Sequence, residues 1–484
     1  ALSEDQGKII TIFPILSRLY PEFSQKRASL VLEELQREVP PGGLVSIFPE
    51  RFFPDKGSPD LRIHQFFEDL SKAEGFVEFT SPSRFLKNLR GLQKAFFPSS
   101  AGERIRYWAM DTPSPAASAQ EFPSGSLPRR FLVKYPEANG IYSKMIFVNT
   151  LINQLRGDKS RKRTAREELL KAQGFDVFCH LGDGGIYCNA LRKAVYRAFL
   201  SAEKITREKG VFIPSLMVFD FDLDGENEFL FQDYHINCYI KTQGASVFEL
   251  DYLPKGWNYL DTLARRREPY VEEPIPEDRY RRGAFLDRLT PPDFSLADAR
   301  EGRFTGSRFC GIERYELASM DRAHGQARFL LAPREGLPFG QMEVEKVYRL
   351  KKDALTVHYG ITNRGKAAER FKLVPEIDLS FPGEGAAFQR VFALRNGAKE
   401  RLPAETVEYR DAGGLEFLDI RNEVIISLLS TGDFTLWISP VRTRCRIGGV
   451  LTDQYQSTCV MPLREVSLLP GETWETEFTV KFSH

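Results

Sequence analysis

The stretch from residue 172 to residue 203 holds the side chains best suited to chemistry, because a polar loop broken by glycines runs directly into a helix. The polar and titratable side chains of that loop are Asp176, Cys179, His180, Asp183 and Tyr187. Imidazole and carboxylate groups accept and donate protons and hydrogen bonds to small ligands. The same groups also satisfy backbone atoms in a buried turn. The loop therefore predicts either a ligand site or a hydrogen-bonded turn.

The segment after the loop is predicted to be an amphipathic helix. Asn189 is a favourable N-cap residue, and Lys209 and Gly210 supply stop signals. The apolar residues that share one helical face are Leu191, Ala194, Val195, Ala198 and Ala202. Such spacing predicts a face that packs in a core.

An acidic run, FDFDLDGENE from residue 219 to 228, forms a second constellation. Its candidate oxygen ligands are Asp220, Asp222, Asp224, the backbone carbonyl of Glu226, and Glu228. This is the spacing by which a loop wraps ligands around calcium, with Gly225 allowing a sharp turn. An Asp-rich turn with its charges facing water would contain the same residues. The two alternatives are a structural calcium site and a solvated turn, and no other cofactor is expected.

The composition is that of an ordinary globular protein of 484 residues, with 42% hydrophobic and 27% charged residues. The net charge of +1 gives no electrostatic reason to expect nucleic acid or an anionic membrane as a partner. No apolar run approaches the roughly 18 residues of a membrane span. Six scattered cysteines lack any zinc spacing and suit reduced thiols, so we expect a cytoplasmic protein. Its oligomeric state is left open.

The chain changes character twice along its length. An apolar run at residues 9–13, a helical pattern at 24–35 and a second apolar run at 44–48 predict a parallel βαβ arrangement. Helical patterns follow up to about residue 210, and strands and turns fill the rest. The run from Trp474 to Phe482 alternates apolar and charged residues, and the segments 346–350 and 355–361 predict an antiparallel hairpin.

The loop and helix at 172–203 resemble the last sequence motif of family 57 glycoside hydrolases, a group of retaining α-amylases and 4-α-glucanotransferases. The matching residues are Ala172, Gln173, Asp176, His180, Gly184, Gly185, Tyr187, Leu191, Arg192, Ala194, Val195 and Tyr196. Three positions depart from the pattern: Cys179 replaces Trp, Phe175 replaces Asn, and Leu181 replaces Gly. The resemblance implies an α-1,4-glucan or maltooligosaccharide ligand, with Asp176, His180 and Tyr187 as the binding residues.

Other blocks extend the resemblance to nearly the whole chain. Residues 7–15 and 43–53 resemble the last two strands of the family's (β/α) barrel, and 245–270 is a further family-like block. In that block, Arg266 and Glu268 are expected to form a buried ion pair. The resemblance implies an α/β plus all-β fold: the C-terminal part of a barrel at 1–110, a helical domain at 111–210, and an antiparallel β-sandwich at 211–484.

Retaining glycoside hydrolysis needs two carboxyl groups about 5 Å apart. In the family the acid/base Asp ends the last barrel strand, where this chain has Phe48 or, with a gap, Glu50. The nucleophilic Glu has no counterpart here. We therefore expect a catalytically impaired homologue that binds α-1,4-glucan. The alternatives are an active enzyme that uses Glu50 with a nucleophile on a missing N-terminal segment, and a scaffold without a sugar site.

Overall fold

The structure is a computed structural model, and it describes residues 128–178, 184–207, 212–268, 270–273, 275–403, 405–447 and 450–483, with short stretches before residue 89. The chain separates into two compact units, 1–100 and 101–484. The described elements of the first are strands β1 (Leu2–Asp5) and β2 (Lys8–Thr11) and helix α4 (Pro82–Asn88). Strand β2 pairs antiparallel with β1. Most of the predicted βαβ arrangement lies outside the described residues.

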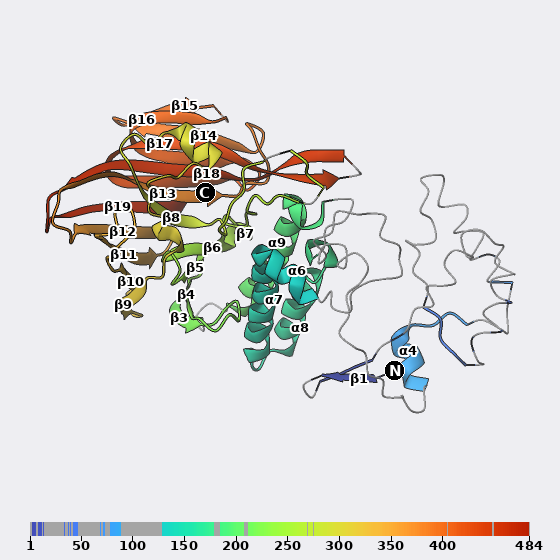
Figure 1. The fold of residues 1–484 in the computed structure, drawn as a ribbon. Coiled ribbons are helices and arrows are strands. Elements are labelled where there is room, and N and C mark those ends of the chain that lie inside the picture. The colour runs from blue at the N-terminus through green and yellow to red at the C-terminus, as the bar shows by residue number, and fades with distance from the viewer. Residues whose placement is uncertain are drawn as a thin grey trace. The chain divides into compact units, whose positions relative to one another are not determined.

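Four helices form a block at the start of the second unit (Figure 1). They are α6 (Pro128–Lys134), α7 (Pro136–Gln154), α8 (Lys159–Lys171) and α9 (Asn189–Thr206), with the short 3-10 turns η3 (Phe175–Phe178) and η4 (Gly185–Tyr187) before α9. Pro136 begins α7, where a missing backbone N–H costs nothing. Asp158 caps α8 by accepting from the Arg161 N–H at 2.8 Å. Val195 and Ala202 of the predicted apolar face are buried in the core of the block, and Leu191 and Ala198 pack against it. Ala194 of that face is exposed, and Phe199 lies in the core although the predicted face does not include it.

Seventeen strands of the second unit form one antiparallel hydrogen-bonded system. They are β3 (Ser215–Phe219), β4 (Glu228–Gln232), β5 (Ile236–Lys241), β6 (Ser246–Tyr252), β7 (Trp257–Asn258), β8 (Ala284–Thr290), β9 (Glu316–Asp321), β10 (Gln326–Leu331), β11 (Met342–Lys351), β12 (Ala354–Asn363), β13 (Glu369–Leu379), β14 (Gln389–Arg395), β15 (Ala398–Leu402), β16 (Val407–Asp419), β17 (Val424–Ile447), β18 (Val450–Leu468) and β19 (Thr473–Ser483). Three short helices lie between strands: η5 (Leu253–Lys255), α10 (Leu296–Glu301) and η6 (Cys310–Ile312).

The pairings arrange these strands in two layers that share their longest members. One layer runs β9-β10-β11-β12-β19 and continues into the first half of β17. The other runs β3-β4-β5-β6-β8-β13-β18 and continues into the second half of β17. Aromatic rings meet between the layers: Phe229 and Phe329 lie 5.0 Å apart, centroid to centroid, and so do Tyr252 and Phe482. The predicted large antiparallel β region is thereby confirmed.

The finer strand predictions also hold. Strands β11 and β12 form the expected hairpin, and the chain turns at Lys352, which has a φ of 53°. Along β19, Phe478, Val480 and Phe482 are buried while Lys481 is exposed. The five cysteines in the described residues are all free thiols. Within the described part of the chain, no helix is long and apolar enough to cross a membrane.

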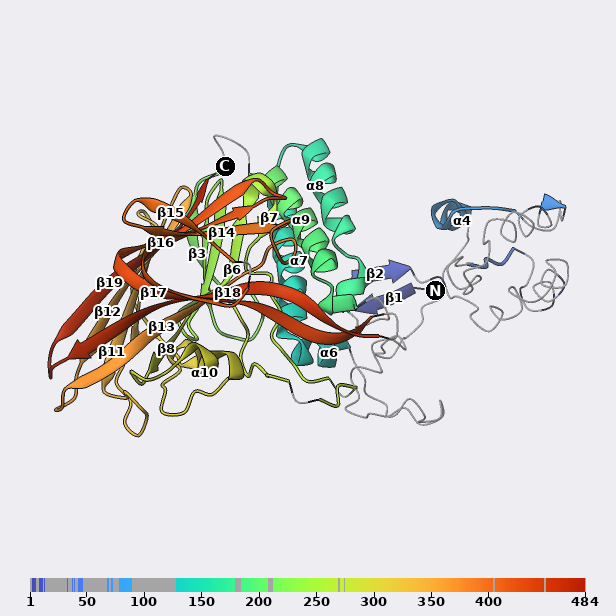
Figure 2. The ribbon, with the colours of Figure 1, turned by 90° about the horizontal axis from the view of Figure 1, so that it is seen from above.

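The helical block lies against the strands of the second unit, with α9 next to β7 (Figures 1 and 2). The hairpin of β17 and β18 extends beyond the other strands (Figure 2). The side chain of Ile447, at the end of β17, lies close to Gly184. A Cβ on that glycine would be 3.2 Å from Cδ1 of Ile447. Gly184 also has a φ of 91°, so both its backbone and its surroundings favour glycine here.

Candidate functional site

The loop before α9 is divided between an exposed turn and a buried one. Asp176 lies on η3 with its side chain exposed, whereas Val177 beside it is buried. Cys179 and His180 lie outside the described residues, as does Asp183. Of the residues predicted to bind glucan, the structure therefore places Asp176 on the surface and Tyr187 in the interior.

Tyr187 is fully buried, at 0% exposure, and its hydroxyl donates to Oε1 of Glu268. Tyr135 donates to the same oxygen at 2.7 Å, and Lys134 lies 3.2 Å from Oε2. Burial, then the neighbouring Tyr135 and Glu268, raises the pKa of Tyr187 well above its usual value. Tyr187 is therefore part of a buried hydrogen-bonded cluster around Glu268, and its contact with a substrate stays a prediction.

The prediction that Arg266 and Glu268 form an ion pair with each other is wrong. Arg266 pairs instead with Glu137 of α7, at 2.8 Å, and Glu268 takes Lys134 and the two tyrosines. Both carboxylates thus join the segment after β7 to the start of the helical block. Charge pattern alone could not separate these pairings, because the partners are about 130 residues apart in sequence.

Arg192 of α9 is the centre of the junction between helices and strands. It is fully buried; Nε donates to Asp261 at 2.9 Å and Nη2 to the amide oxygen of Gln456 on β18 at 2.7 Å. Its third contact, from Nη1 at 2.5 Å, is to the carbonyl of Ile186 in η4. One guanidinium therefore fixes the loop, the helix and the β layers together.

Asn189 does not cap α9 as predicted. The helix begins at Asn189 with Cys188 in the cap position, and the Asn189 amide donates to the carbonyl of Phe381 at 3.2 Å. The side chain is buried against the strands, where an amide must find a partner outside its own helix. The tertiary contact thus overrides the local capping preference.

The acidic loop between β3 and β4 brings three of the predicted calcium ligands together. Oxygen atoms of Asp220, Asp222 and Asp224 lie within 4.8 Å of one another. Oδ1 of Asp222 is buried and accepts no hydrogen bond among the described residues. Asp220 also accepts from the N–H groups of Asp224 and Gly225, each at 3.1 Å, which holds the turn closed.

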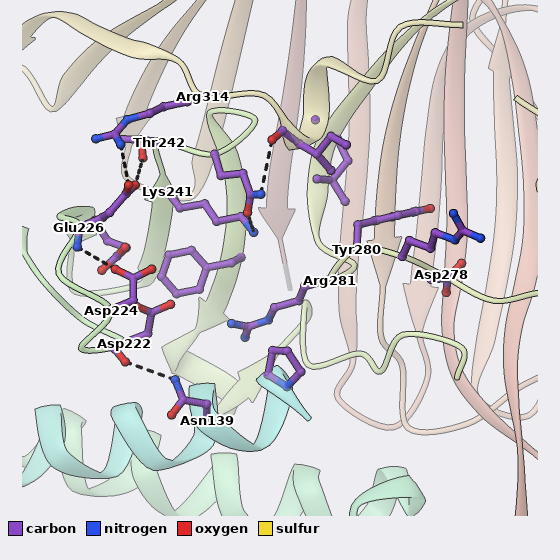
Figure 3. Close-up of a pocket in the computed structure, with 18 of the residues that line it drawn as sticks. Asn139, Asp222, Asp224, Glu226, Lys241, Thr242, Asp278, Tyr280, Arg281 and Arg314 are labelled. Atoms are coloured by element: carbon purple, nitrogen blue, oxygen red, sulfur yellow. Dashed lines mark hydrogen bonds and ion pairs between the residues drawn. The ribbon is translucent and has the colours of Figure 1, made fainter. Parts of the chain in front are cut away.

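The two glutamates of that loop point elsewhere. Glu226 turns its carboxylate to Arg314, at 2.6 Å, and to the hydroxyl of Thr242 (Figure 3). Glu228 accepts from the Phe221 N–H at 2.6 Å, and burial followed by the nearby aspartates raises its pKa to about 8. Three carboxylates and a tight turn match the donor set that Ca²⁺ prefers, and the calcium itself stays a prediction.

Glu50, the predicted acid/base, lies outside the described residues. Sequence reasoning also missed a fully buried ionic cluster around Lys144. Its ammonium lies 2.7 Å from Glu249, 2.9 Å from Asp251 and 3.2 Å from Glu203. Lys144 occurs in an apolar helical pattern, so its burial has no local signal.

The fold agrees with what comparison with known proteins shows. The family described as "Alpha-amylase/4-alpha-glucanotransferase, middle domain" matches residues 126–206, and its C-terminal counterpart matches 220–276 and 271–478. The chain belongs to this α-amylase/4-α-glucanotransferase family, which confirms the family 57 resemblance.

Two relatives show how much of a family member the chain covers. It is 26% identical over 425 residues to a protein named α-amylase from Pyrococcus horikoshii, covering 79% of this chain and 62% of the relative. It is 27% identical over 303 residues to a 4-α-glucanotransferase from Thermococcus litoralis, covering 56% of this chain and 43% of the relative. The chain thus spans less than two thirds of either relative.

A solved structure shares the fold. A crystal structure of 4-α-glucanotransferase from Thermococcus litoralis aligns with 99% of this chain and 74% of its own, with a TM-score of 0.71 and 21% sequence identity.

Proposed function

We propose that this chain is an α-1,4-glucan-binding member of the α-amylase/4-α-glucanotransferase family that is catalytically impaired. The observation that carries the proposal is the ordered match of the family's middle and C-terminal domains over residues 126–478. Impairment is proposed because Phe48 or, with a gap, Glu50 stands where the family has its acid/base Asp.

The proposed glucan surface is the loop that carries Asp176 and His180. Asp176 is exposed on η3, and a carboxylate can accept hydrogen bonds from sugar hydroxyls. Tyr187 and Arg192 fix the neighbouring turn η4 to Glu268 and to β18. The turn η4, which follows the loop, is therefore held by buried contacts.

An active glucan hydrolase or glucanotransferase is the second candidate, and the names of the relatives favour it. Here Glu50 acts as the acid/base, and the nucleophile lies on a segment that this chain does not contain.

Incubation with maltoheptaose, followed by product analysis, separates the two candidates. The impaired homologue leaves maltoheptaose intact. If the wild type instead produces shorter and longer maltooligosaccharides and the Glu50→Gln variant does not, the chain is an active enzyme. A protein that neither converts nor binds maltoheptaose would be the scaffold.

We also propose that the acidic loop binds one structural calcium ion through Asp220, Asp222 and Asp224, with the Glu226 carbonyl as a further ligand. Glu228, which the sequence also predicts as a ligand, accepts from the Phe221 N–H instead. Asp222 carries the proposal, because its buried oxygen needs a partner. A chelator is expected to lower the melting temperature of the wild type, and calcium to restore it. In the Asp222→Asn variant, neither the chelator nor calcium should change the melting temperature. A wild-type melting temperature that the chelator leaves unchanged would mean that the loop is only a solvated turn.

A further inference from the structure

A pocket of about 770 Å³ lies between the start of α7, the acidic loop and strands β5 and β6 (Figure 3). It is lined by Asn139 from the helix, Asp222 and Asp224 from the loop, Lys241 from β5, Phe248 from β6, and Arg281 from the segment before β8. Pockets of 300–1,000 Å³ are the usual size of small-molecule sites. No role proposed above accounts for its basic side.

Six basic residues line the pocket: Lys134, Lys241, Arg266, Arg279, Arg281 and Arg314. Lys134, Arg266 and Arg314 pair with carboxylates, whereas Arg281 and Lys241 form no ion pair among the described residues. Arg281 is half-buried, and the described residues offer its guanidinium no hydrogen-bond acceptor and no ion-pair partner. The guanidinium lies over the ring of Phe248, 5.5 Å from the centroid. A Cβ on Gly140 would lie 2.7 Å from Nη2 of Arg281, so the absent side chain leaves room for this arginine. Gly140 of α7 therefore allows the Arg281 side chain to occupy this position.

Lys241 has only one polar contact among the described residues, 3.4 Å from the side-chain oxygen of Gln243. Burial, and then the charge of Arg281, lowers the pKa of Lys241 to about 8. Among the described residues neither cationic side chain forms an ion pair with a carboxylate, although the charges of Asp222, Glu228 and Asp224 act on Lys241 from a longer distance and partly offset the lowering of its pKa. Half-buried cations without partners are costly unless something else neutralises them.

The opposite side of the pocket accepts hydrogen bonds. Asp222 and Asp224 face it, and Oδ1 of Asp222 has no donor within the described part of the chain. Asn139 donates to the backbone carbonyl of Asp222 at 3.3 Å and so fixes this side to α7 (Figure 3). Among the described residues, no ion pair crosses the pocket to join these aspartates to Arg281 or Lys241.

The geometry points to a ligand that is anionic at one end and rich in hydroxyl groups at the other, and we propose that this pocket binds a hexose phosphate. The guanidinium of Arg281 offers a planar set of donors that suits phosphate oxygens, and Lys241 adds a second charge. In the calcium-free protein, sugar hydroxyls donate to Asp222 and Asp224, the same carboxylates that are proposed above to bind calcium. A simple anion would leave the aspartates unused, and a neutral glucan would leave the two cations unpaired. The proposal is independent of glucan binding at the Asp176 loop.

Calorimetric titration of the full chain in calcium-free buffer tests this site. The probes are glucose 1-phosphate, inorganic phosphate and maltose, with melting temperatures measured for every variant. We expect glucose 1-phosphate to bind, inorganic phosphate to bind at least about tenfold more weakly, and maltose to leave this pocket empty. Arg281→Gln and Lys241→Gln should each weaken glucose 1-phosphate binding about tenfold or more. Arg370→Gln, at an exposed arginine of β13, is the matched control and should bind as the wild type does.

Three results would overturn the proposal. They are the absence of glucose 1-phosphate binding at millimolar concentration, equal binding of inorganic phosphate, and binding that Arg281→Gln and Lys241→Gln leave unchanged. If one variant fails to fold, the other decides. Asp222→Asn adds a direct check of the sugar end: it should weaken glucose 1-phosphate and leave inorganic phosphate unaffected.

Discussion

At the scale of single residues, Tyr187 is a motif residue whose side chain is buried and hydrogen-bonded within the protein. The family resemblance assigns it to glucan binding, yet its hydroxyl is buried and donates to Glu268. Asp176 is exposed, and its role in glucan binding stays a prediction. The depth of each side chain could not be predicted, since it depends on Tyr135 and Lys134, which lie more than 50 residues away.

Tyr187→Phe is expected to lower the stability of the ligand-free protein by about 2 kcal/mol, because it removes one hydrogen bond to a buried carboxylate. Urea unfolding measures this. Tyr142→Phe is the matched control, at a tyrosine of α7 that is 37% exposed, and should change stability by less than about 0.5 kcal/mol. Unchanged stability in Tyr187→Phe, together with weaker maltoheptaose binding, would return Tyr187 to a direct role in binding.

Glu249 predicts how stability depends on pH. Burial, and then the charge of Asp251, raises the pKa of Glu249 in the folded protein. The unfolded chain loses this proton near pH 4.3, whereas the folded protein retains it to higher pH. The folded state therefore binds more protons, and stability contributed by this group falls as the pH rises above about 4.3.

Glu249→Gln should remove that loss, because the amide is neutral throughout and Lys144 keeps Asp251 and Glu203 as partners. The melting temperature of the wild type relative to the variant is expected to fall between pH 5 and pH 8. Glu316→Gln, at an exposed position of β9, should follow the wild type. A difference between wild type and Glu249→Gln that stays constant with pH would contradict the raised pKa.

At the scale of elements, α9 is the part that joins the helical block to the β layers. Its apolar face follows from helical spacing and was predictable. Its polar face was not, because Asn189, Arg192 and Lys193 contact residues of distant strands and turns. Hairpins such as β11 and β12 were predictable for the opposite reason: alternation and a short turn act locally.

Arg192→Met should destabilise the protein by about 3–5 kcal/mol, since it leaves Asp261 buried without its guanidinium partner. The control is Arg163→Met on α8, where an exposed arginine pairs with Glu167 and contributes little. Urea unfolding of both variants gives the comparison. Should Arg192→Met prove insoluble, Gln456→Leu tests the same junction with a smaller change. Equal stability of the two arginine variants would mean that α9 is held by apolar packing alone.

At the scale of the whole molecule, the order of a helical block followed by a large antiparallel region was predictable from the change in sequence pattern. The sharing of β17 between two layers was not, because a strand of 24 residues leaves no sign of where its partners change. The pocket between α7 and β5 was also beyond prediction, since Arg281 and Lys241 are 40 residues apart. Both features arise from packing among distant segments.

The central claim is that the chain binds α-1,4-glucan at the loop before α9 without converting it. Calorimetric titration with maltoheptaose, with product analysis of the same samples, tests it most directly. We predict saturable binding by the wild type, at least tenfold weaker binding by Asp176→Ala, wild-type binding by Asp293→Ala at an exposed aspartate away from the loop, and maltoheptaose recovered intact. No binding by the wild type, or products that depend on Glu50, would contradict the account.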